Sequence, residues 1–151
     1  MDYLDRITPE TIERLNQNEV FVFGSNSAGR HGKGAAKTAM GWGAKYGQGY
    51  GLQGRTFGIP TVNATISNKL PLETIQKHVD KYIQFAKENP KMIFLTTKIG
   101  CGLAGWNEHL IAPMFKEAVN VQNIYLPKSF WKIILKGNED DKVLENMGQA
   151  K

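Results

Sequence analysis

Short apolar runs alternate along the chain with stretches of helical periodicity. Four runs of strand length are rich in β-branched and aromatic residues, and they cover residues 19–23, 56–59, 91–97 and 123–126. Continuous apolar runs of this length favour buried strands. The sequence therefore predicts four strands. It also predicts a loop over residues 47–54, and either a further edge strand or the start of a last helix over residues 130–135.

Helical periodicity is clearest over residues 71–88. Ile75, Val79 and Ile83 recur there at helical spacing, and Pro90 follows the predicted end. Three shorter helices are expected: one beginning at Thr8, where a capping hydroxyl precedes Pro9, one over residues 35–40, and one over residues 114–119 with Pro113 in its first turn.

Strands that alternate with helices indicate an α/β domain with a mostly parallel central sheet. We expect one domain over residues 1–136, followed by an acidic tail or short helix over residues 137–151. Two glycine-rich loops, residues 24–34 and 100–105, each follow a strand and precede a helix. Because such sheets bind ligands beyond the carboxyl ends of their strands, both loops are expected at that edge.

The composition limits the class of protein. The chain has 151 residues, of which 41% are hydrophobic, and this excludes a largely disordered chain. No apolar run approaches the roughly 20 residues that a membrane span needs, and no charged and then apolar leader begins the chain. A single cysteine cannot form an internal disulfide. We therefore expect a cytoplasmic protein without a membrane partner, and its oligomeric state is left open.

Basic charge and glycine are concentrated in one part of the chain. No acidic residue lies between Glu19 and Glu73, and 11 of the 16 glycines lie between Gly24 and Gly58. The net charge is +5 overall and about +7 over residues 1–136. Exposed backbone amides and cations without carboxylates are typical of an anion site. The alternative is a solvated surface in which acids are absent by chance.

The first loop offers groups that suit a ribose and a phosphate. It is not a P-loop, because Ser27 stands where that motif needs glycine and Gly34 where it needs a hydroxyl. The Asn26 carboxamide either donates to and accepts from a ribose hydroxyl, or bonds the backbone of its own turn. His31 serves either ligand contact and proton transfer, or packing of the loop.

The second loop, from Gly100 to Gly105, matches G-x-G-x-x-G. The dinucleotide motif also needs an acid about 20 residues later. Residues 121–124 contain none, so phosphate cradling is favoured over a dehydrogenase. Cys101 is interpreted as a small residue between two glycines, and Trp106 either stacks on the ligand or packs over the loop. No histidine and carboxylate grouping has metal-ligand spacing, and neither a metal nor a cofactor is expected.

Both loops resemble the ligand loops of macro domains. Residues 22–26 and 31–36 resemble the first, in which a buried strand ends in Asn and glycines lead into a helix. Residues 99–106 resemble the second, phosphate-binding loop. With the motifs at 46–49, 51–54 and 58–61, the chain is similar to a family of small, largely uncharacterised bacterial and phage proteins related to macro domains, over roughly residues 19–127.

The resemblance implies a three-layer macro-domain-like α/β fold that binds ADP-ribose or a related nucleotide. Asn26 would bond the distal ribose, and Gly32 and Gly34 would border that ribose and the diphosphate. The phosphate amides would come from Gly100, Cys101, Gly102, Leu103, Ala104 and Gly105, and Gly24, Ser25, Lys33 and Trp106 complete the expected binding set. Some macro domains also hydrolyse ADP-ribosyl esters or ADP-ribose phosphate, and here Asn26 and His31 would then polarise the water.

Two departures from the macro-domain pattern affect the ligand. Macro domains usually hold an acid shortly before the first ligand-loop strand, where it bonds the adenine amino group. Here only Glu19 is acidic, and it lies too close to the strand. Lys33 stands within the usual glycine run and adds a cation that favours an extra phosphate.

Two other classes of function remain as alternatives. One is a nucleic-acid-binding module, in which Trp42, Tyr46 and Tyr50, interleaved with Lys45 and Arg55, would stack bases. The other is a protein-interaction domain in which the glycine loops are only structural.

Overall fold

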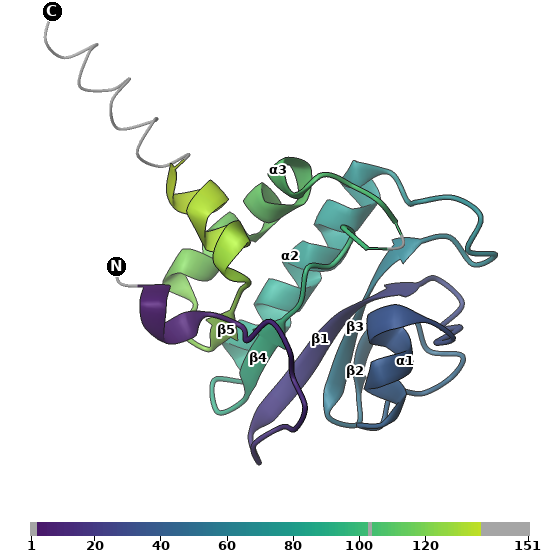
Figure 1. Ribbon diagram of the computed structural model, residues 1–151, viewed down its shortest axis with the longest axis horizontal. Coiled ribbons are helices and arrows are strands. Elements are labelled where there is room, and N and C mark those ends of the chain that lie inside the picture. Colours follow the sequence, from purple (N-terminus) through teal and green to yellow (C-terminus); the bar gives the residue numbers. More distant parts are fainter. Residues whose placement is uncertain (1–2, 103, 137–151) are drawn as a thin grey trace, which may run out of the picture.

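β1 (Glu19–Asn26) is the central strand of a five-stranded sheet in the computed structural model, which describes residues 3–102 and 104–136 (Figure 1). The order is β2-β3-β1-β4-β5. The other strands are β2 (Gly51–Gln53), β3 (Thr56–Val62), β4 (Ile93–Thr96) and β5 (Ile124–Tyr125). The four predicted strands are thus confirmed. β3 continues through Pro60, which is tolerated because Pro60 lies beyond the part of β3 that pairs with β2.

The sheet is mixed, and this corrects the expectation of a mostly parallel sheet. β3 and β4 each pair in parallel with β1, and β5 pairs in parallel with β4. β2 pairs antiparallel with β3. β2 lies within residues 47–54, which were expected to be a loop. Only Gly54 and Arg55 separate β2 from β3, and a connection this short joins antiparallel strands.

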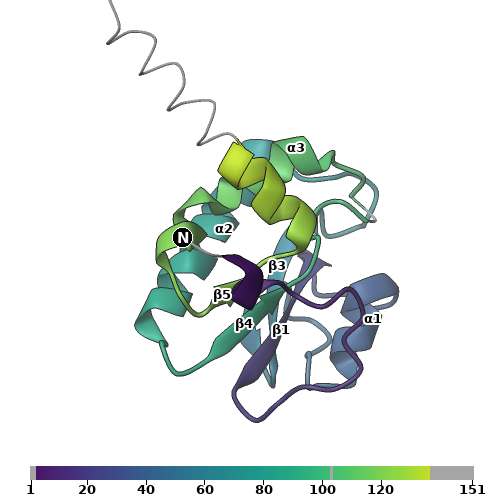
Figure 2. The same cartoon turned by 60° about the vertical axis from the view of Figure 1, so that its left-hand side comes forward.

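Helices cover both faces of the sheet, each over its own apolar core. Successive residues of a strand point to opposite faces. Val20 and Val22 of β1 accordingly belong to a large core with α2 (Leu72–Glu88), whereas Phe21 and Phe23 belong to a smaller core with α1 (Gly34–Met40). Figures 1 and 2 show α1 on one side of the sheet and α2 on the other. Both helices agree with the sequence prediction.

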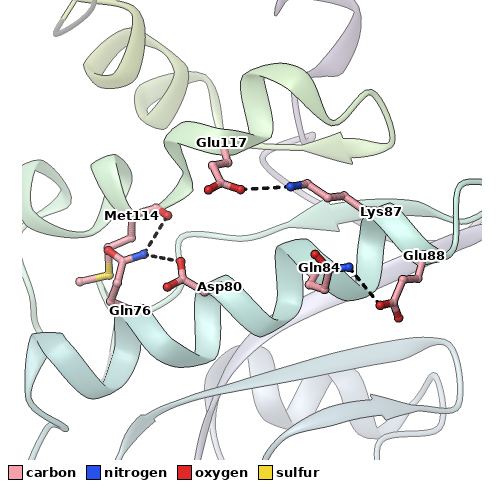
Figure 3. A network of polar contacts seen from close by, with 7 residues as sticks. All are labelled: Gln76, Asp80, Gln84, Lys87, Glu88, Met114 and Glu117. Atoms are coloured by element: carbon pink, nitrogen blue, oxygen red, sulfur yellow. Dashed lines mark hydrogen bonds and ion pairs between the residues drawn. The ribbon is translucent and has the colours of Figure 1, made fainter.

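Polar side chains of α2 contact the helical segment that follows β4 and α3 (Glu108–Ile111). Gln76 Nε2 donates to Asp80 Oδ1 at 2.9 Å and to the Met114 carbonyl at 3.2 Å, and Lys87 pairs with Glu117 at 3.2 Å (Figure 3). The contacts with Met114 and Glu117 join α2 to η2 (Ala112–Asn120). Both partners of the ion pair are exposed, so the buried apolar side of α2 stabilises the fold more than this pair does.

The helix expected over residues 114–119 has a different form. It is a 3₁₀ segment, η2, which directly follows the short helix α3 (Glu108–Ile111) and is interrupted by the non-helical backbone of Phe115. Pro113 lies near its start, as expected. Residues 128–136 are helical, so the alternative of an edge strand at 130–135 is wrong.

The helix expected from Thr8 is absent, because the backbone there pairs with Leu126, the residue after β5. Thr8 N donates to the Leu126 carbonyl at 2.9 Å, and Ile7 and Leu126 form a parallel bridge. The described helical residues near this end are those of η1 (Tyr3–Arg6). The acidic tail predicted over residues 137–151 lies outside the described residues. None of the helices within residues 3–102 and 104–136 has the length and apolarity needed to cross a membrane.

Candidate functional site

The two glycine loops open onto one cavity. It has a volume of about 580 Å³ and lies at the carboxyl ends of β1, β3 and β4. Its walls include Gly24, Ser25, Asn26, Gly32, Lys33 and Gly34 from the first loop and Gly100, Gly102 and Ala104 from the second. A Cβ atom added to Gly24 would lie 3.5 Å from the Gly100 nitrogen, so the two loops approach each other closely. The convergence expected from the strand-to-helix rule is therefore present.

Three residues that line this cavity from the second loop have unpaired backbone amides. Within the described part of the chain, the N–H groups of Gly100, Gly102 and Ala104 have no hydrogen-bond partner, whereas the Cys101 amide donates to the Lys98 carbonyl and the Gly105 amide to the Gly102 carbonyl. Unpaired amides clustered on a loop form an anion-binding concavity. Leu103 lies outside the described residues.

The charges around the cavity favour an anion. Arg30, Lys33 and Lys98 line it, and no Asp, Glu or His is among its described lining residues. Lys98 also pairs with Glu108 at 3.4 Å. All three cationic side chains are exposed. They therefore attract an anion without the cost of removing their own charges from water.

Asn26 is buried and braces the first loop. Its Oδ1 accepts from the Arg30 amide at 2.9 Å, and its Nδ2 donates to the Arg30 carbonyl at 2.8 Å. These bonds agree with the interpretation in which the Asn26 side chain bonds the backbone of its own turn. A carboxamide has two donors and two acceptor sites, so one of each remains for a ribose hydroxyl at the cavity wall.

His31 is buried behind the first loop and does not line the cavity. Its Nε2 lies 3.0 Å from Gln53 Oε1, and its ring packs edge-on against Phe23. Gln53 Oε1 also accepts from the Lys45 amide, so the amide is oriented with its oxygen toward His31 and Nε2 carries the proton. His31 therefore holds the loop against β2, in agreement with the alternative in which His31 packs the loop.

Cys101 and Trp106 also lie outside the described cavity wall. Both are partly buried against the large core. Lys69 Nζ lies 4.0 Å from the centre of the Trp106 ring, so a described side chain already contacts the indole. Burial, with a further contribution from Glu108, raises the pKa of the Cys101 thiol to about 11 and keeps it protonated near neutral pH.

Cys101 should therefore react slowly with an alkylating agent. The neutral thiol is a poor nucleophile, so the alkylation rate should remain low at neutral pH and increase as the pH approaches the thiol pKa of about 11. Iodoacetamide labelling followed by intact-mass measurement over a pH series tests this. Rapid labelling at neutral pH, comparable to that of free cysteine, would contradict it.

Several lining residues were missed by the sequence analysis. Thr61 and Thr97 lie at the carboxyl ends of β3 and β4, a position that the strand prediction alone could have indicated. Tyr46 and Ile66 reach the cavity from two other loops. Ile66 has a φ of 59°, which is strained for a β-branched residue, and no sequence pattern signals it.

The glycines between Gly24 and Gly58 occupy two different kinds of position. Some allow close backbone contacts: a Cβ on Gly49 would lie within 2.3 Å of the Asn26 carbonyl oxygen, and one on Gly58 equally close to the Gly49 oxygen. Others border open space, since a Cβ on Gly32 would meet nothing within 4 Å. Glycine richness here thus reflects tight packing as well as an open site.

A second cavity of about 960 Å³ adjoins the first. The two share Ala35, Thr97 and Lys98 in their walls, so they lie side by side, and together they are called the cleft. The second cavity has apolar lining from Ile7, Ile12, Phe21 and Pro127, and cations from Lys98, Lys128 and Lys132. Among the described residues that line the second cavity, Glu10 is the acidic one.

The aromatic residues suggested for base stacking are mostly used in packing. Trp42 lies 5.0 Å from Phe21, centre to centre, and Tyr50 packs against Phe57 and His78. Tyr46 is 68% exposed and lines the first cavity. Within the described residues, no group of three His, Cys, Asp or Glu side chains is placed to hold a metal ion.

Comparisons with known proteins support the fold alone. No family model matches the chain, and no curated protein matches it. A solved protein of unknown function from Bacteroides thetaiotaomicron has a similar fold, with a TM-score of 0.51 and 14% sequence identity over 76% of this chain and 88% of that one. The chain therefore has a mixed α/β fold with a five-stranded sheet flanked by helices.

Proposed function

We propose that this protein binds ADP-ribose or a related nucleotide diphosphate, in a macro-domain-like arrangement, with the diphosphate between the two glycine loops. The observation that carries the proposal is their convergence on one cavity lined by unpaired amides and cations. Both features favour an anion, and a merely structural pair of loops would need neither.

The two adjacent cavities suit a ligand with a polar centre and a group on each side of it. Volumes of about 580 and 960 Å³ lie in the usual range of small-molecule sites. The distal ribose would lie in the first cavity near Asn26 and Thr61. The nucleoside would lie in the second cavity over its apolar lining, which Phe21 and Ile12 help to form.

Binding is better supported than hydrolysis. General-base catalysis requires a titratable group within hydrogen-bond reach of the attacking water. The described lining of the first cavity includes no carboxylate or imidazole, and His31 is turned toward Gln53. Hydrolysis would therefore depend on a base supplied by the substrate.

Isothermal titration calorimetry with ADP-ribose tests the proposal. We expect a Kd below about 100 µM, which corresponds to about −5.5 kcal/mol. A single-stranded oligonucleotide of similar charge serves as the comparison ligand. Heat with the oligonucleotide but none with ADP-ribose up to millimolar concentration would contradict the proposal and favour the nucleic-acid alternative.

Asn26→Ala should weaken ADP-ribose binding by about tenfold or more, because the loop loses its brace and the ribose loses a partner. Asn89→Ala is the matched control. Asn89 Nδ2 donates to the Phe85 carbonyl at 2.8 Å at the end of α2, near the amino end of β4 and away from the cavity. Equal affinities of the two variants by calorimetry would rule out the role of Asn26.

A further inference from the structure

The second cavity offers positive charge that the diphosphate of ADP-ribose does not use. We propose that the nucleoside half of the natural ligand carries an additional phosphate, which Lys128 and Lys132 bind. This inference rests on the proposed function and specifies the ligand class of the same cleft: a nucleotide diphosphate with a phosphomonoester on its nucleoside.

Lys128 and Lys132 are placed to act together. Both belong to the helical residues 128–136, and residues four positions apart lie on the same side of a helix. Both line the second cavity, and both are exposed. Among the described residues neither has a carboxylate within ion-pair distance, so their charge is available to a ligand.

Glu108 contacts two residues of the second cavity's wall and is already paired there. Glu108 accepts a hydrogen bond from Ser129 Oγ at 2.6 Å and pairs with Lys98 at 3.4 Å. The Ser129 bond, followed by the Lys98 charge, holds the pKa of Glu108 below its usual range, so its carboxylate stays ionised beside Lys98. It therefore balances Lys98 and leaves Lys128 and Lys132 uncompensated. Glu10 is the described acidic residue of the cavity wall itself.

A buried hydroxyl in the same wall also lacks a partner. Thr8 lines the second cavity and is 5% exposed, and its Oγ1 makes no hydrogen bond within the described residues. Buried hydroxyls are normally satisfied, so this group is one that a polar ligand would complete. Glu19 does not line the second cavity, and its carboxylate accepts a hydrogen bond from the Asn16 amide at 2.8 Å.

Calorimetry with two nucleotides tests the inference. The probes are ADP-ribose and ADP-ribose 2′-phosphate, which differ by one phosphomonoester on the adenosine ribose. At roughly 0.1 M salt, where the Debye length is about 10 Å, the wild-type protein should bind the 2′-phosphate form about tenfold more tightly. The double variant Lys128→Ala/Lys132→Ala should bind both nucleotides with the wild-type affinity for ADP-ribose, within about twofold.

Two controls define where the phosphate binds. Lys91→Ala/Lys116→Ala removes the same charge from exposed positions outside both cavities and should keep the preference. Lys33→Ala, in the first cavity, should reduce the affinities for both nucleotides by the same factor. The melting temperatures of all variants should match that of the wild type, because the substituted lysines are exposed.

Three results would overturn the inference. Equal wild-type affinities for the two nucleotides would show that the extra phosphate is not recognised, and the proposed function would stand. A preference that survives in Lys128→Ala/Lys132→Ala but disappears in Lys33→Ala would place the phosphate in the first cavity. Absence of binding by either nucleotide would remove the proposed function as well.

Discussion

Gly102→Val should reduce the affinity for ADP-ribose by at least about 100-fold while leaving the melting temperature unchanged. Gly102 lines the first cavity, its φ lies outside the left-handed region, and an added Cβ would meet nothing within 4 Å. The fold therefore accepts a side chain at this position. The branched valine would occupy the space in which the phosphate contacts the loop amides.

A graded series separates blocking of the cavity from damage to the loop. Gly102→Ala should have a smaller effect than Gly102→Val, and Gly32→Val should reproduce the large effect from the opposite wall, since Gly32 also borders open space. Gly41→Ala is the control, because Gly41 has right-handed helical backbone at the end of α1 and lies outside both cavities. Wild-type affinity in Gly102→Val would contradict the assigned binding site.

Arg6→Ala should lower the free energy of unfolding by about 3 kcal/mol. The buried guanidinium donates to the carbonyls of Ala118, Val119, Val121 and Ile124 at 2.7–3.2 Å. Alanine would leave these acceptors without the donor and open a gap beside Trp131, whose ring lies 4.9 Å from the guanidinium carbon. Urea unfolding followed by tryptophan fluorescence measures the difference.

Arg14→Ala provides the comparison for Arg6. Arg14 is exposed, so its replacement should change stability by less than about 0.5 kcal/mol. Similar stabilities of the two variants would show that the carbonyl contacts of Arg6 do not anchor the amino-terminal segment. Arg6 also matters for the cleft, because the residues that follow it, Ile7 and Thr8, line the second cavity.

The regular elements were predictable where one pattern dominated. The runs at 19–23 and 91–97 became strands because they are buried on both faces of the sheet, and residues 71–88 became a helix because its apolar side recurs every three to four residues. The helix expected from Thr8 failed for a tertiary reason: its backbone bonds Leu126, far along the chain. Local capping preference is weaker than such pairing.

The location of the site was predictable, but the roles of its side chains were not. Strand ends determine where the loops lie, and parallel neighbours bring them to one edge. The orientation of His31 depends on Gln53, and that of Asn26 on the backbone of Arg30. Lys128 and Lys132 are distant in sequence from both loops and carry no motif, so only the fold brings them to the cleft.

The structure of the complex with ADP-ribose tests the central claim most directly. We expect the diphosphate oxygens within hydrogen-bond distance of the Gly100, Gly102 and Ala104 amides, with the distal ribose near Asn26 and the nucleoside toward Lys132. A ligand bound elsewhere on the surface, or in the cleft with its phosphates facing solvent and away from both loops, would contradict the claim.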